Sequence, residues 1–479
     1  MNAKRGIRST LIAATAAAAL LTGGAPAALS APGDWTQLSQ ASSATVYPKL
    51  SNTAVPTAAW FGSSLHVLWP QAQSSGAQAY FTSVLNSDGV VTVPPTIAFP
   101  AWSTLIPNPT LLSLSGQPFL SFSGLNPGRS GAQYYATSPD GLTWSVATGS
   151  MSETQSAYAG YGSDAIDNAG TPVWVGNAGS TTGIRWHVGT SDANPAPAGS
   201  DQSFALAGCC AYSAAAARDA ATGAVYAAFY SNSSATTENG IMVGQILPGS
   251  ANWRQAPGST DIQDGRAASV STDERVAMVG RPGGGVYVAY VVGYPSVKLI
   301  RVYDVVSGAT LDVPGSSGAK AVAMSAEPDG RLWLTWHNGR DVKTVHTNPA
   351  VTTFGSVGTQ GAPRGADFLW KSTIAGTAGG ASVVVTATTQ SALNAWHTKV
   401  ARMLTISGPR TARRSANVRF TVTDAGDAVA GARVVFGRRA GTTNSAGKVT
   451  IKAPASRGRV KATAKKDAYD PGLTRVRVR

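Results

Sequence analysis

The sequence predicts an all-β protein, a seven-bladed β-propeller followed by a small C-terminal β-sandwich. Charged residues make up only 13% of the 479 residues, and there are 53 Gly and 12 Trp. This composition suits short strands joined by tight turns. From residue 35 onward a strand–turn–strand unit recurs at intervals of roughly 45–60 residues. After residue 402 apolar and polar side chains alternate with a period of two, which is typical of half-buried strands.

The recurring unit is easiest to see in its second strand, which is apolar, often aromatic, and preceded by a Gly-containing turn. The seven second strands are expected at residues 65–69, 118–122, 172–175, 224–229, 286–290, 332–336 and 382–386. One such unit cannot bury both faces of its sheet, so we expect the units to close into a ring. Six blades is the alternative if the last unit is not a blade. Residues 35–38 are expected to supply the outer strand that closes the ring.

The first residues are typical of a secretory signal peptide. Lys4, Arg5 and Arg8 precede a short Ala-rich apolar run, and small residues follow it. We therefore expect residues 1–31 to be a signal, residues 32–402 the propeller and residues 403–479 the sandwich, in a secreted, extracellular protein. No later stretch is long enough to cross a bilayer as a helix.

The positive charge is confined to the predicted sandwich. Residues 401–479 hold 18 Lys/Arg against 4 Asp, and they account for the whole formal charge of +14. Alternating Arg475, Arg477 and Arg479 would form a cationic stripe on one face of a strand. This face either contacts acidic polymers or simply serves solubility. Aromatic residues are sparse there, so specific nucleic-acid binding is not expected.

Residues 134–144 contain one recognisable turn motif, in which Ser138, Asp140, Gly141, Thr143 and Trp144 follow a predicted strand. It resembles the Asp-box of the sialidase and BNR-repeat family, Ser-x-Asp-x-Gly-x-Thr-Trp, with one spacer missing. The resemblance implies a sialidase-like propeller in which the box is a structural turn between third and fourth strands, on the face away from the ligand.

The segment 422–447 contains the sequences Asp-Ala-Gly and Asn-Ser-Ala-Gly around a short strand. It resembles the carboxypeptidase-regulatory-like and bacterial Ig-like modules, with Ala428 where those modules usually have Pro. The resemblance implies a prealbumin-like sandwich that is non-catalytic and serves as a spacer or attachment unit.

Catalysis is not favoured by the motifs. Sialidases resembling this fold carry an early Arg-Ile-Pro motif, which is absent, and residues 35–400 contain only four glutamates. A pair of carboxylates from different blades would still support a glycoside hydrolase or lyase. The five histidines are dispersed without metal-ligand spacing, so we expect no metal and no cofactor.

The only two cysteines, Cys209 and Cys210, are adjacent. In an oxidising compartment they can form a strained vicinal disulfide, and the alternative is two buried thiols. We favour the disulfide, which closes almost no chain loop and so stabilises the fold little. Its expected role is therefore to shape a surface.

In a propeller, the links between blades and the loops between second and third strands share one face, here called the top face. We expect a ligand site there, built from aromatic, amide and cationic side chains. The candidate ligand-binding residues are Trp102, Arg129, Tyr158, Cys209, Cys210, Tyr212, Tyr294, His337 and Arg340.

The function that the sequence favours is a secreted, non-catalytic propeller that binds a glycan or other extracellular ligand at its top face. The basic sandwich would attach or space it. The alternative is a propeller-type glycoside hydrolase, sialidase-like, or a lyase.

Overall fold

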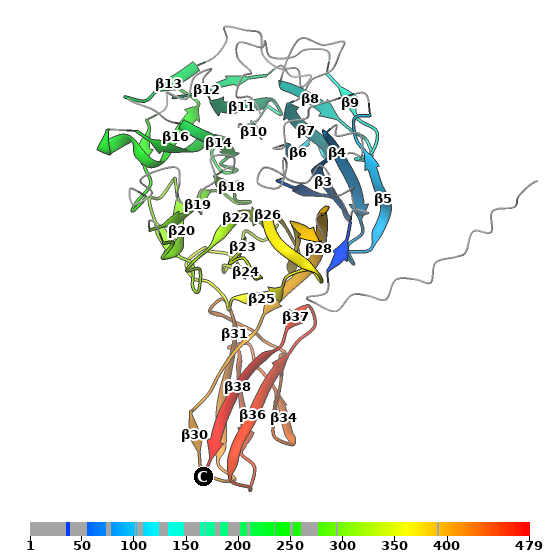
Figure 1. Ribbon diagram of the computed structural model, residues 1–479. Helices are drawn as coiled ribbons and strands as arrows, with labels where there is room; N and C mark the ends of the chain where they lie inside the picture. Colours follow the sequence, from blue (N-terminus) through cyan, green and yellow to red (C-terminus); the bar gives the residue numbers. More distant parts are fainter. Residues whose placement is uncertain are drawn as a thin grey trace, which may run out of the picture.

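The computed structural model describes residues 35–38, 55–72, 78–100, 102, 109–123, 133–147, 163–167, 169–177, 183–189, 202–207, 211–233, 235–249, 252–259, 276–293, 296–389 and 392–479. These residues form the predicted all-β fold, a ring of sheets around a central opening with a two-sheet sandwich projecting from it (Figure 1). No helix among the described residues is long and apolar enough to cross a bilayer.

The described strands of the ring form seven sheets, each with four antiparallel strands, and the first six sheets follow the chain order from the centre outward. The first two sheets contain β2 (Thr57–Phe61), β3 (Ser64–Ala72), β4 (Gln78–Leu85) and β5 (Val91–Ile97), then β6 (Thr110–Leu114), β7 (Gln117–Ser123), β8 (Gln133–Thr137) and β9 (Ser145–Val146). The third and fourth contain β10 (Ser163–Ile166), β11 (Pro172–Asn177), β12 (Gly183–Val188) and β13 (Gln202–Ala205), then β14 (Ala211–Arg218), β15 (Val225–Asn232), β16 (Asn239–Leu247) and β17 (Arg254–Gln255). A short 3-10 helix, Thr236–Glu238, precedes β16.

The fifth and sixth sheets contain β18 (Ala277–Gly280), β19 (Val286–Val292), β20 (Leu299–Asp304) and β21 (Thr310–Asp312), then β22 (Lys320–Ala326), β23 (Leu332–His337), β24 (Asp341–His346) and β25 (Gly358–Gly361). The seventh contains β26 (Ala366–Thr377), β27 (Gly380–Thr389), β28 (Ala392–Met403) and, as its outer strand, β1 (Thr36–Gln37). The seven segments predicted as second strands fall on β3, β7, β11, β15, β19, β23 and β27, and Ala224, one residue before β15, is the one predicted residue outside its strand.

The second strands are apolar because sheets pack against them on both sides. All six residues of β23 are buried, as are nine of the ten residues of β27. Continuous burial of this kind removes the alternation seen in sheets with one wet face. The apolar runs in the sequence were therefore a direct signal of a position between neighbouring sheets.

The ring is closed by the N-terminal residues. Thr36 and Gln37 pair with His397 and Trp396 of β28, and the Leu38 amide donates to Ala395 O at 2.9 Å. Leu38 is buried, and the Trp35 indole N–H donates to Gly361 O at 2.6 Å. The first described strand thus completes the last sheet of the ring.

We expect removal of this strand to weaken the ring. A chain beginning at Ser39 loses the buried Leu38 side chain, and losses of this kind cost about 2–5 kcal/mol. It also exposes the edge of β28 to pairing with another chain. Urea unfolding should show lower stability and size-exclusion chromatography should show oligomers, with the full-length Leu38→Ala variant destabilised but monomeric. Unchanged stability of the truncated chain would contradict this role for β1.

The sandwich comprises two sheets that enclose a separate apolar core. One contains β29 (Thr405–Ser407), β31 (Asn417–Asp424), β32 (Asp427–Ala428) and β35 (Lys448–Lys452). The other contains β30 (Thr411–Ala412), β38 (Gly472–Val478), β36 (Gly458–Lys465), β33 (Arg433–Phe436) and β34 (Arg439–Thr442). Phe420 and Phe436 meet in the core at 5.1 Å between ring centroids. The short strand β37 (Tyr469–Asp470) instead pairs in parallel with the end of β28, which ties the sandwich to the ring.

The turn from Ser138 to Trp144 lies between β8 and β9. The Asp140 carboxylate accepts the backbone N–H groups of Leu142 and Thr143 at 2.8 and 2.7 Å, and these bonds to the charged form lower its pKa. The Ser138 hydroxyl accepts the Gly141 N–H at 2.7 Å. Trp144 packs on the apolar cluster of the first two sheets. The Asp140 carboxylate and the Ser138 hydroxyl are therefore used by hydrogen bonds within the turn, and the Gly141 carbonyl accepts one from Thr82 of the first sheet at 2.9 Å.

Gly141 also lets this turn lie against the neighbouring sheet. Its φ is +75°, and a Cβ there would lie 1.7 Å from Nδ1 of His66. Gly116, in the turn between β6 and β7, has a similar φ of +83° with nothing within 4 Å. We expect Gly116→Ala to cost about 1–2 kcal/mol through its backbone alone. Gly141→Ala should cost several kcal/mol in the same urea titration, since a buried ring must move as well. Equal losses would show that contact with His66 does not constrain Gly141.

Candidate functional site

The strand order defines two faces of the ring. Because consecutive strands are antiparallel, links between sheets and loops between second and third strands lie on the top face. The turns between first and second strands, together with the β24–β25 connection and the sandwich junction, lie on the opposite, bottom face. The two faces carry different groups of polar side chains.

On the bottom face a buried ionic cluster joins the ring to the sandwich. Glu327 is fully buried, and the Arg402 guanidinium donates both to it and to Asp329, the latter at 2.7 Å. The Trp333 indole N–H also donates to Glu327. Burial raises the pKa of Glu327, whereas its bonds from Arg402 and Trp333 act in the opposite direction. Asp329 is partly exposed, whereas Glu327 is fully buried and is therefore inaccessible to a substrate.

The sandwich contributes Asp424 to the same junction. Its carboxylate lies 3.5 Å from Nη1 of Arg331 and 3.2 Å from Nε2 of His346, although the His346 contact lacks hydrogen-bond geometry. Burial lowers the pKa of His346, and Asp424 partly opposes that effect. In the part of the chain that the structure describes, no group of three or more His, Cys, Asp or Glu side chains is arranged to hold a metal ion.

In the centre of the ring the inner strands enclose a cavity of about 260 Å³. Its lining comes from β2, β6, β14, β18, β22 and β26 and is mostly apolar, with hydroxyls such as Thr110 and Ser372. Lys371, which is 5% exposed, is the one charged side chain among the described lining residues. Val55, Pro56 and Pro109 also line the cavity, and they precede inner strands. The cavity therefore extends to the top half of the channel.

Three inner strands carry the same irregularity near their top ends. Each has one extra residue relative to its partner strand, between Tyr212 and Ala215, between Lys320 and Ala323, and between Leu369 and Ser372. A bulge of this kind redirects side chains and is common beside binding sites. In β26 it falls at Trp370 and Lys371, so the channel lysine and the neighbouring indole occupy the irregular segment.

An aromatic pair lies beside this bulge. The rings of Phe368 and Trp370 are 4.3 Å apart between centroids, and Phe368 is 43% exposed. The Trp370 indole N–H donates to the Thr388 hydroxyl at 2.7 Å, which fixes the ring. Both residues come from the first half of β26, which begins on the top face. They form a partly exposed apolar surface close in sequence to Lys371.

His337, the last residue of β23, contacts the backbone of this segment. It is 2% exposed, its Nε2 lies 3.1 Å from Trp370 O, and its Nδ1 accepts the Gly339 N–H at 3.2 Å. Burial and the nearby Lys320 and Lys371 lower the pKa of His337 to about 4, so the ring is neutral at pH 7. A neutral imidazole with its proton on Nε2 satisfies both contacts.

The other predicted ligand residues differ in placement. Trp102 is buried, with its ring 5.1 Å from Phe122 and 4.6 Å from Tyr134, so it is a core residue rather than an exposed surface. Tyr212 is half-buried at the start of β14 and stacks on Tyr230 at 5.4 Å. Arg340 is exposed in the β23–β24 turn.

Arg129, Tyr158, Cys209, Cys210 and Tyr294 lie outside the described residues. The described segment just before the cysteines is anchored, because the Ala207 N–H donates to the Glu238 carboxylate at 2.8 Å. The sequence did not point to Phe368, Trp370 or Lys371. The available signal was a pair of aromatics and a lysine, Phe-Leu-Trp-Lys, directly after the link between the last two units.

No protein-family model matches the chain, and no curated protein matches it in sequence. Among solved structures it is similar to polysaccharide lyase Uly1, with 9% identity over 74% of this chain and 91% of that one and a TM-score of 0.42. It is also similar to Trypanosoma rangeli sialidase, with 9% identity over 72% of this chain and 54% of the sialidase chain, and a TM-score of 0.39. A third similar structure is that of an Aleuria aurantia lectin mutant in complex with α-methyl-L-fucoside. Its identity is 8% over 85% of this chain and 97% of the lectin chain, and the TM-score is 0.37. At these identities and TM-scores the similarities assign this chain neither a family nor a function.

Proposed function

We propose that the protein binds an extracellular glycan at the top of the propeller channel, with one acidic sugar unit in the central cavity. The observation that carries this proposal is Lys371, a buried cation in a cavity otherwise lined by apolar and hydroxyl groups. A lysine side chain carries three hydrogen-bond donors, so a lysine in the channel lining suits a ligand with an acidic group. The volume of about 260 Å³ lies just below the usual range for small-ligand pockets, roughly 300–1,000 Å³, and suits a single sugar unit.

The aromatic pair supports a sugar ligand. The apolar face of a pyranose packs on aromatic rings, and Phe368 and Trp370 present such a surface close in sequence to Lys371. In this proposal His337 is a positioning residue, since it contacts the Trp370 backbone from a buried position. Arg340 and Tyr212 remain candidates for contacts at the rim.

Binding without catalysis is supported by the lining of the cavity. Glycoside hydrolysis by two carboxylates needs them on either side of the scissile bond, about 5–10 Å apart. Among the described residues that line the cavity there is no Asp or Glu. Glu327, the buried glutamate of the sixth sheet, lies at the sandwich junction on the bottom face.

The experiment is a glycan array on the mature protein with two variants. Trp370→Ala should lose most of the bound signal, whereas Leu473→Ala, which removes an exposed apolar side chain from the sandwich, should keep it. Release of sugar products from a bound glycan would replace the binding role with the hydrolase or lyase. Failure of every glycan to bind would contradict the proposal.

Secretion and the cysteine pair belong to the same proposal. Residues 1–31 would be removed on export, and Cys209 and Cys210 would form a vicinal disulfide next to Tyr212 on the top face. Intact mass spectrometry of the exported protein tests both. The expected mass lacks the signal residues and increases by about 2 Da on reduction. The domain at residues 403–479 would act as an Ig-like spacer, and Ser138–Trp144 as a structural Asp-box.

A further inference from the structure

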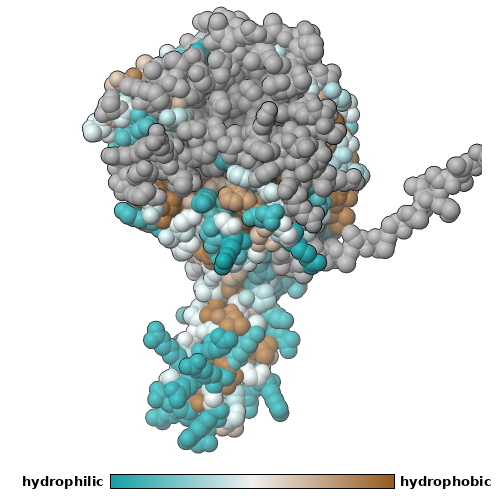
Figure 2. All heavy atoms as spheres, viewed as in Figure 1, coloured by the Kyte–Doolittle hydropathy of each residue, from teal (hydrophilic) through white to brown (hydrophobic). Residues whose placement is uncertain are grey.

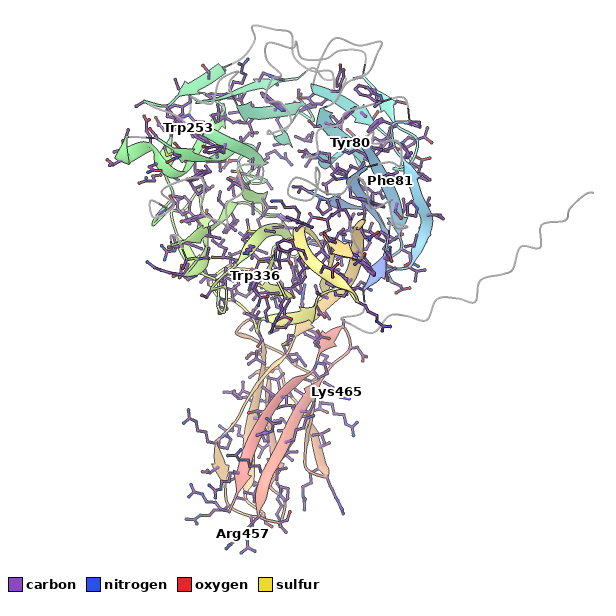
Figure 3. All side chains as sticks on the ribbon, in the orientation of Figure 1. Tyr80, Phe81, Trp253, Trp336, Arg457 and Lys465 are labelled. Carbon is purple, nitrogen blue, oxygen red and sulfur yellow. The ribbon has the colours of Figure 1, made fainter. Side chains whose placement is uncertain are left out.

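The end of the sandwich farthest from the ring is built from arginine-bearing connections. The chain from Ser407 to Asn417, the link between β35 and β36, and the C-terminus all meet there. Backbone bonds hold them together, from Arg414 N to Arg479 O at 3.1 Å and from Ser415 N to Pro454 O at 3.3 Å. Figure 3 shows Arg457 at this far end and Lys465 nearer the ring.

These connections surround a cleft of about 870 Å³. Four arginines line it, and all four are exposed: Arg413, Arg414, Arg457 and Arg479. Thr411 and Ser415 add hydroxyl groups to the lining. The Arg479 guanidinium donates to the Thr411 hydroxyl at 3.1 Å, which leaves its other donors available to a ligand.

Charge in the sandwich is separated along its length. All four aspartates lie at the end next to the ring. Asp424 and Asp427 contact Arg331, Asp470 pairs beside β28, and Asp467 is in the adjoining turn. No ion pair within residues 405–479 involves an arginine of the cleft. Figure 2 shows hydrophilic side chains covering this far end. Among the described residues, no Asp or Glu side chain lines the cleft beside its four arginines, and a net positive cleft of this kind favours an external polyanion.

The chemistry of the cleft limits the class of partner that it can bind. Guanidinium groups bind oxyanions through two parallel hydrogen bonds, and several in one open cleft suit repeated anionic groups. Proteins that bind single-stranded nucleic acid usually add exposed aromatics that stack on bases. In the sandwich Phe420 and Phe436 are buried, and Tyr469 lies at the opposite end. A membrane surface would also require an exposed apolar face. The described residues that line the cleft include no large apolar side chain.

We propose that this arginine cleft binds an acidic polysaccharide, independently of the channel site. The sandwich would then hold the protein on a charged matrix while the propeller contacts its own glycan. The attraction is electrostatic, so the affinity should fall steeply as salt concentration rises.

Heparin is the test probe, titrated against the full mature chain at low and physiological salt. A triple variant, Arg413→Gln, Arg414→Gln and Arg457→Gln, should weaken binding at least tenfold. The matched control, Arg433→Gln, Lys448→Gln and Lys465→Gln, removes the same charge from exposed residues outside the cleft and should change affinity less than threefold. Trp370→Ala should leave heparin binding unchanged, which separates this test from that of the channel.

Three results would overturn the proposal. Equal losses in the two triple variants would mean that only net charge matters. Absence of heparin binding by the unmodified chain would remove the site. Equally tight binding of oligodeoxythymidine through the same arginines would assign the cleft to nucleic acid instead.

Discussion

Replacing Arg402 by Ala is expected to destabilise the protein by about 3–5 kcal/mol, because it leaves a buried carboxylate without its cation. Glu327 is fully buried, and Arg402 is the guanidinium that contacts it. The Trp333 indole would remain as a donor. The loss should appear as a lower free energy of urea unfolding, followed by tryptophan fluorescence at pH 7.

The same variant gives a test of sign. Burial raises the pKa of Glu327, and removing Arg402 takes away a contact that lowers it. A carboxyl group whose pKa is raised by folding destabilises the folded protein at pH values above that pKa, where the group is charged. The lost stability returns as the pH falls and the group becomes protonated. The difference between the variant and the original chain should therefore shrink from pH 7 to pH 5.

A double variant serves as the control. Glu327→Gln with Arg402→Met keeps an acceptor for Trp333 and removes both charges, so it should recover most of the lost stability. If the double variant were as unstable as Arg402→Ala, the buried charge would not be the cause.

Acid is expected to destabilise the ring through its buried histidines. Burial lowers the pKa of both His337 and His397 to about 4, with Lys399 adding to the effect at His397. His397 lies at the seam between the seventh and first sheets, where a Cβ on Gly89 would come within 2.9 Å of its ring. Both rings are therefore neutral in the folded protein at pH 5–7.

The sign follows from proton binding. Between pH 6.5 and 4 the unfolded chain binds protons that these two folded histidines do not, so stability falls as pH decreases through that range and changes little above it. The loss approaches roughly 3 kcal/mol per histidine near pH 4. Urea unfolding from pH 8 to pH 4 measures it. His337→Gln and His397→Gln together should flatten the slope below pH 6.5. A slope that both variants leave unchanged would show that other groups are responsible.

The strands and their order were predictable because their signals are local. Apolar runs after Gly turns identified all seven second strands, and residues 35–38 were expected to close the ring, as β1 does. Trp102 was not predictable, because its burial depends on Phe122 and Tyr134 from other strands. Similarly, no local pattern shows that the His337 ring contacts the backbone carbonyl of Trp370, which lies 33 residues further along the chain.

The proposed channel site was missed for a related reason. In the sequence, Lys371 is a single lysine in a largely apolar strand. Its position in the cavity lining follows only when inner strands from six sheets meet around the centre of the ring. The ionic junction was hidden in the same way, since Glu327 and Arg402 are 75 residues apart. Contacts between residues far apart in the chain leave little trace in any single segment of sequence.

The central claim is that Lys371 and Trp370 bind an acidic sugar in the channel. The direct test titrates the acidic glycan selected on the array, and its neutral counterpart, into the original chain, Lys371→Met and Trp370→Ala. We predict at least tenfold preference for the acidic sugar in the original chain, loss of that preference in Lys371→Met, and weaker binding of both sugars in Trp370→Ala. An unchanged preference in a folded Lys371→Met variant would contradict the claim.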